Sequence, residues 1–132
     1  MKNFLSLITI MATLLCLTSC SRSYVSSYTA FMMNTGKGNN YCRAEFNRFD
    51  GTYVFKLKKT NGGEGDIKYT SSLGDGELNV YYDIHGTKEL LFSITGGESV
   101  NDRGGYIESE KTVYIIIEAV STSDGSVYIE LE

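Results

Sequence analysis

Hydrophobic and polar residues alternate with a period of two through most of this chain. The pattern is clearest in two sets, Leu78, Val80, Tyr82 and Ile84, and Val127, Ile129 and Leu131. Successive side chains of a β-strand point to opposite faces, so this period predicts half-buried strands. Apolar residues do not recur at the three- and four-residue spacing of a helix. The chain is therefore expected to be all-β.

The pattern places strands at residues 28–33, 41–49, 52–59, 67–70, 78–84, 90–94, 106–108, 113–120 and 127–131. Turn residues separate them at 34–40, Asp50-Gly51, 61–65, 74–76, Gly86-Thr87 and 123–126, and 95–103 reads as a long polar loop. Residues 113–120 are apolar on both faces, which is typical of a covered central strand. The turn at 123–126 then predicts a final hairpin over residues 113–131.

Regular turns and the absence of proline favour an antiparallel β-sandwich of about eight strands, with a jelly-roll-like or immunoglobulin-like outline. A small β-barrel is the alternative, because strand order cannot be read from the pattern. The aromatic residues on the apolar register are expected in the core: Phe46, Phe55, Tyr69, Tyr82 and Phe92.

The first nineteen residues have the parts of a signal peptide. Lys2 precedes an apolar stretch over residues 4–17, which is too short for a permanent transmembrane helix of roughly 20 residues. The stretch closes on Leu17-Thr18-Ser19-Cys20, which resembles the lipobox of bacterial lipoproteins. The resemblance implies cleavage before Cys20, a diacylglycerol on its thiol, and an extracytoplasmic protein anchored to the cell membrane or outer membrane. A cysteine within an ordinary signal sequence is the alternative.

This organisation gives a signal peptide at 1–19, a Ser-rich tether at 20–27 and one β domain at 28–132. Removal of Lys2 takes the formal charge from −4 to −5, and an acidic surface argues against a nucleic-acid partner. Cys16 leaves with the signal and Cys20 carries lipid, so Cys42 has no intramolecular partner. Its position in a strand predicts a buried side chain. An intermolecular disulfide or a reactive thiol is the alternative.

Residues with catalytic potential are few. His85 is the only histidine, lies beside a predicted turn, and has Asp83 nearby, but no Gly-x-Ser-x-Gly motif accompanies it. The carboxylate pairs fall in turns, where solvation is the usual explanation: Asp75 with Glu77, Glu64 with Asp66, and Asp102 with Glu98. The glycines at 62–65 and 96–97 suit hairpins better than phosphate loops. We therefore expect no catalytic site, no metal site and no cofactor.

Three tyrosines fall on the polar register of different strands, Tyr81, Tyr114 and Tyr128. They would form a flat ligand platform if they met on one face, although cross-strand tyrosines also stabilise sheets without binding anything. Two functions follow. The favoured one is a membrane-anchored structural or protein-interaction domain that contacts another surface protein. The alternative is a small-ligand or carbohydrate-binding module, for which a glycan would be the partner.

Overall fold

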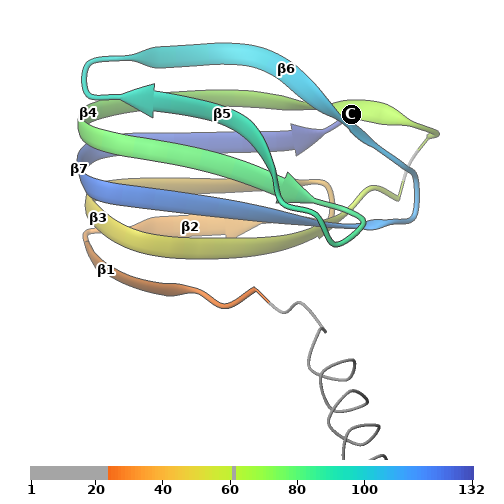
Figure 1. Ribbon diagram of the computed structural model, residues 1–132, viewed down its shortest axis with the longest axis horizontal. Coiled ribbons are helices and arrows are strands. Elements are labelled where there is room, and N and C mark those ends of the chain that lie inside the picture. The colour runs from red at the N-terminus through yellow and green to blue at the C-terminus, as the bar shows by residue number, and fades with distance from the viewer. Residues whose placement is uncertain (1–23, 61) are drawn as a thin grey trace, which may run out of the picture.

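The computed structural model describes residues 24–60 and 62–132, which form seven antiparallel strands (Figure 1). The strands are β1 (Ser27–Phe31), β2 (Asn34–Lys37), β3 (Tyr41–Lys58), β4 (Gly65–Asp83), β5 (Glu89–Thr95), β6 (Ser99–Ile107) and β7 (Thr112–Leu131). The described residues contain no helix, and hence none able to cross a membrane. The all-β prediction is confirmed. The predicted signal peptide and Cys20 lie outside the described residues.

The strands β3, β4 and β7 are at least twice as long as the others, and each passes through both layers of the fold. The sheet order is β1-β3-β7-β4-β5, with β2 paired to β3 and β6 paired to β4. We call layer A the set formed by β2, β6 and residues 41–48 of β3, 65–72 of β4 and 123–131 of β7. Layer B contains β1, β5 and residues 51–58, 77–83 and 112–120 of the same three strands.

The two layers pack face to face around one hydrophobic core. Tyr69 of layer A stacks on Phe92 of layer B, with ring centroids 4.6 Å apart. Ile129 and Ile117, one from each layer, are both fully buried in the same core cluster. An open sheet folded over in this way is a β-sandwich and not a closed barrel, which confirms the first of the two predicted architectures.

The predicted core is largely correct. Phe46, Phe55, Tyr69 and Phe92 are buried, and Tyr82 packs against them from a partly buried position. Cys42 is fully buried, as its place in the strand predicted, and burial raises the pKa of its thiol to about 12.

Three predicted turns are corners between the layers: Asp50-Gly51 in β3, residues 74–76 in β4 and residues 123–126 in β7. Residues 113–120 and 127–131 do not pair with each other; both pair with β3 and β4, and together they form the single strand β7. Asp50-Gly51 likewise lies inside β3, where the pairing shows a register shift. Figure 1 shows the three long strands folding back at the left of the view. The chain does reverse direction at these points, as predicted. The prediction was wrong about pairing, because the two halves of each strand pair with other strands and not with each other.

The edge strand β2 was missed, and β6 was predicted too short, at 106–108. β2 lies in the stretch expected to be a turn, and most of β6 lies in the expected loop at 95–103, which shrinks to residues 96–98. Leu90 lies on the apolar register of the strand predicted at 90–94, together with Phe92 and Ile94, but it is 56% exposed, while its neighbour Leu91 packs against the core. A register shift between Val80 and Tyr81 opposite this strand accounts for the change of face.

Candidate functional site

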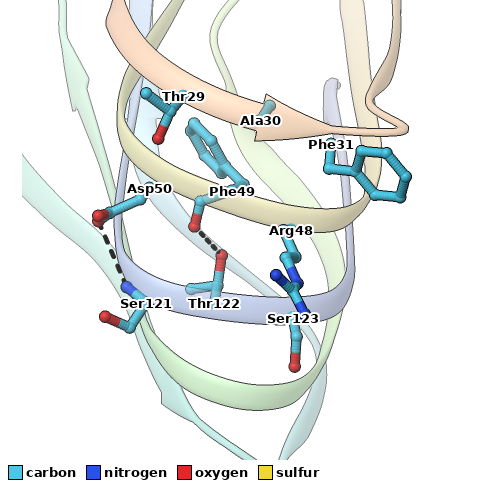
Figure 2. A pocket seen from close by; sticks show the side chains of 9 residues that line it. All are labelled: Thr29, Ala30, Phe31, Arg48, Phe49, Asp50, Ser121, Thr122 and Ser123. Atoms are coloured by element: carbon cyan, nitrogen blue, oxygen red, sulfur yellow. Dashed lines mark hydrogen bonds between the residues drawn. The ribbon is translucent and has the colours of Figure 1, made fainter.

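The corner where β3 and β7 change layers carries a groove. About 440 Å³ of open space lies between the end of β1 and the bends of the two long strands. We call it the corner groove; it is lined by Thr29, Ala30, Phe31, Arg48, Phe49, Asp50, Ser121, Thr122 and Ser123. Figure 2 shows β1 along one side, β7 along the other, and β3 between them.

The backbone at the corner requires unusual torsions. Gly51 has φ +118°, and a Cβ there would overlap the carbonyl oxygen of Ser27 on β1. Ser121 has φ 49° although it is not glycine. Residues held in this region without being glycine are uncommon and are enriched at functional sites. The corner is therefore a place where the fold maintains a locally unfavourable conformation.

Two hydrogen bonds hold β3 and β7 together beneath the groove (Figure 2). The Ser121 N–H donates to Asp50 Oδ1 over 3.3 Å. The buried Thr122 hydroxyl donates to the Phe49 carbonyl oxygen. These bonds link β3 to β7 at the strained corner and support the floor of the groove.

Charged and aromatic groups border the same groove. Arg48 and Phe31 are cross-strand partners, and the Phe31 side chain is 60% exposed. In Figure 2 the Arg48 side chain extends towards the β7 bend beside Ser123. None of the ion pairs formed by the described residues involves Arg48. The groove combines an exposed aromatic ring with an acidic group, a basic group and several hydroxyls.

The predicted tyrosine set is divided between two surfaces. Tyr81 and Tyr114 lie on the outer face of layer B, where Tyr114 pairs with Asp83 and Tyr81 with Ile116. Tyr128 pairs with Thr70 and lies on the outer face of layer A. The structure thus brings two of the three residues together and places the third on the other layer.

The Tyr81 and Tyr114 surface is already occupied by other parts of the chain. The Tyr24 ring lies against Tyr114, with centroids 5.4 Å apart. The Lys88 ammonium lies 4.3 Å from the centre of the Tyr81 ring and 2.8 Å from Glu118. The hydrogen bond from Lys88 to Glu118 raises the pKa of the lysine. This face is therefore a packed surface and a poor platform for a ligand.

Tyr128 remains accessible on layer A. It is 39% exposed and stacks on Tyr41, with centroids 6.3 Å apart. Partial burial and the nearby Glu130 raise the pKa of its hydroxyl. The pair lies outside the corner groove, and the interaction explains both rings as cross-strand stabilisation.

The residues weighed for catalysis form no catalytic constellation in the described part of the chain. His85 lies 3.0 Å from Glu108, whereas Asp83 accepts hydrogen bonds from Tyr24 and from the Gly86 N–H. No group of three or more His, Cys, Asp or Glu side chains within residues 24–60 and 62–132 is arranged to hold a metal ion.

Carboxylates of the pairs that were weighed as sites from the sequence have local partners. Asp75 accepts from the Ser123 hydroxyl, and Asp66 lies 3.7 Å from Arg103. Glu98 accepts from the Thr95 hydroxyl and N–H, and these bonds lower its pKa. Each of these carboxylates therefore has a structural role in its turn or strand.

No protein-family model and no curated protein matches the chain. Solved structures with a similar fold include TmCBM61 in complex with beta-1,4-galactotriose, at 13% identity and a TM-score of 0.43, covering 80% of this chain and 83% of that one. A variant of the family 29 carbohydrate-binding module CBM29-2 complexed with mannohexaose matches at 10% identity and a TM-score of 0.40, covering 82% and 90%. Drosophila melanogaster CENP-C bound to CAL1 matches at 13% identity and a TM-score of 0.34, covering 85% and 82%.

Proposed function

We propose that this protein is a lipid-anchored extracytoplasmic domain that binds a carbohydrate in the corner groove. The observation that carries the proposal is the combination of the exposed Phe31 ring with Arg48 and Asp50 at one hollow. A sugar ring presents an apolar face of C–H groups and an edge of hydroxyls. It therefore suits a site that offers an aromatic surface beside charged hydrogen-bonding groups.

The groove has the dimensions and chemistry for such a ligand. Ligand sites usually enclose about 300–1,000 Å³ and place a few polar groups among apolar ones. Asp50 accepts hydrogen bonds and Arg48 donates them, while the hydroxyls of Thr29, Ser121 and Ser123 do both. A neutral polyhydroxylated ligand uses donors and acceptors together, whereas a purely apolar ligand would leave these groups unpaired.

Direct binding tests this function. The purified domain is titrated calorimetrically with a panel of neutral oligosaccharides, and Phe31→Ala and Asp50→Asn are compared with the parent. Both variants should weaken binding to the sugar that the parent binds. Leu90→Ala is the matched control, because Leu90 is also an exposed hydrophobic residue, at 56%, but lies on β5 away from the groove. Equal affinity of all three variants, or no binding to any sugar of the panel, would refute the proposal.

The anchoring part of the proposal rests on Leu17-Thr18-Ser19-Cys20. Two or three acyl chains hold a protein stably on a bilayer, whereas one does so only marginally. Cys20→Ser should keep the precursor uncleaved and without lipid. Metabolic labelling with a fatty-acid probe measures this, and undiminished label on the variant would contradict the assignment.

A second candidate function is protein binding along β1. Exposed hydrophobic residues gather on and beside this edge strand: Val25 at 73%, Tyr28 at 45%, Phe31 at 60% and Met32 at 70%. Exposed apolar patches and open strand edges are common at protein interfaces. Val25→Ser combined with Met32→Gln separates the two functions, because it removes apolar contact area while leaving the residues that line the groove. Loss of a protein partner with unchanged sugar affinity would favour this second function.

A further inference from the structure

The residues just before β1 are attached to layer B and form what we call the strap, residues 24–26. The Val54 N–H donates a hydrogen bond to Ser26 Oγ over 2.9 Å. The Tyr24 hydroxyl donates to Asp83, a carboxylate that is only 2% exposed, and its ring packs on Tyr114. Three separate contacts thus extend the path of β1 along β3 and across to β4 and β7.

These contacts fix where the chain enters the domain. Asp83 is the last residue of β4, and Tyr114 lies near the start of β7. Both are at the end of layer B opposite the corner, beside the loops at 84–88 and 108–111, which lie at the right of Figure 1. Ser121 in the groove is seven residues further along β7, which corresponds to about 23 Å at roughly 3.3 Å per residue.

The proposed lipid is close to this entry point. Only four residue steps separate Cys20 from Tyr24, and a fully extended chain covers at most about 14 Å over that length. This reach is shorter than the distance along layer B from Tyr114 to the groove. The domain without residues 1–19 also carries a formal charge of −5. An anionic bilayer surface therefore repels it and does not pull other parts of its surface onto the lipid.

We infer that the strap sets the orientation of the anchored domain: the end formed by residues 84–88 and 108–111 faces the bilayer, and the corner groove faces away from it. The inference rests on the proposed lipid anchor and deepens the proposed function. It makes the groove accessible to a ligand that arrives from outside the membrane surface. The buried carboxylate of Asp83 then has a role, because its hydrogen bond from Tyr24 holds the strap at one end of the sandwich.

Paramagnetic broadening of backbone amide signals measures this orientation. The chain from Cys20 onward contains all seven strands, and it is coupled at Cys20 to a maleimide lipid in nanodiscs. Cys42 is fully buried and does not compete for the reagent. A fraction of the nanodisc lipids carries a gadolinium chelate on its headgroup. The amide signals of residues 85–88 and 109–111 should be lost, while those of 29–31, 48–50 and 121–123 should be retained.

A strap variant provides the matched control. Tyr24→Ala combined with Ser26→Ala removes the side chains that make the strap contacts, so broadening should spread to the groove amides. Equal loss at both ends in the parent protein would overturn the inference, and so would an unchanged pattern in the strap variant. The lipid is attached chemically here, so the result does not depend on lipidation in the cell, which the fatty-acid labelling of Cys20→Ser tests separately.

Discussion

Truncation of Ile115 tests whether β7 is the central strand of the sandwich. The Ile115 side chain is fully buried, and its cross-strand partners are Phe55 on β3 and Tyr82 on β4. Ile115→Ala removes three carbon atoms, and at about 0.8 kcal/mol per buried methylene the transfer contribution is about 2.4 kcal/mol. The cavity left between two layers adds to this, so the total loss of unfolding free energy should be about 2–5 kcal/mol.

Urea denaturation followed by circular dichroism measures this loss. Two variants of the same strand provide controls, Val120→Ala at a side chain that is 54% exposed and Tyr128→Ala at one that is 39% exposed. Both should cost less than Ile115→Ala, and Val120→Ala least, because these side chains remain partly in water and their truncation leaves no closed cavity in the core. A loss below about 1 kcal/mol for Ile115→Ala, or equal losses for all three variants, would mean that β7 is peripheral and that the two-layer description is incorrect.

Three further outcomes are expected. Gly76→Ala should destabilise the domain by about 1–3 kcal/mol, because Gly76 has φ +93° and no room for a Cβ, whereas Gly63→Ala, with open space around it, should leave the denaturation midpoint nearly unchanged. Cys42 should not react with a thiol reagent at pH 8 until the protein unfolds, and fast labelling of the native protein would contradict its burial. Since burial raises the pKa of the thiol from 9.0 to about 12, the free energy of unfolding should fall as the pH rises through that interval. Thr95→Val should raise the pKa of Glu98 towards its ordinary value in a side-chain NMR titration, because the hydroxyl that stabilises the carboxylate is removed; an unchanged pKa would show that this bond does not form in solution.

The core could be predicted because alternation reports burial directly. Residues on the apolar register are buried in both long strands, for example Leu78 and Val80 in β4 and Val127 and Ile129 in β7. Ile116 is an exception to the alternation of buried and exposed residues. It lies on the outer face of layer B, between its cross-strand partners Val54 and Tyr81, yet it is only 2% exposed. The apolar character of both faces of residues 113–120 predicted such a covered strand.

The strand β2 and the first part of β6 could not be predicted, because their stability comes from pairing and not from burial. Residues 34–37 of β2 bury no side chain, and their backbone pairs with the buried strand β3. In β6 only Ile107 is buried, while the polar residues at 99–103 pair with β4. A mostly polar segment that is held in a sheet by backbone hydrogen bonds to a neighbouring strand has the composition of a loop. The neighbour is known only once the strand order is known.

The corner groove was missed for a related reason. Its lining comes from β1, β3 and β7, so Thr29, Asp50 and Ser121 meet only in the folded sandwich. Asp50-Gly51 has the composition of a hairpin turn, and local sequence does not distinguish a turn within one sheet from a corner between two layers. The sequence pattern suggested only the tyrosines as a ligand platform, whereas the groove contains one exposed phenylalanine beside Ala30, Phe49 and several polar side chains.

The division of the tyrosine set has a precise cause in the backbone of β7. Tyr114 and Tyr128 occupy the same register, and both do face outwards, which is as far as a period of two can predict. Between them, Ser121 and Asp124 adopt positive φ values of 49° and 51°. Each of these residues interrupts the alternation once, so that the buried residues are Ala119, Thr122 and Gly125. The second interruption restores the register that the first had shifted. The outward face is thereby preserved while the strand moves from one layer to the other, and two residues predicted to be neighbours end on opposite surfaces of the sandwich.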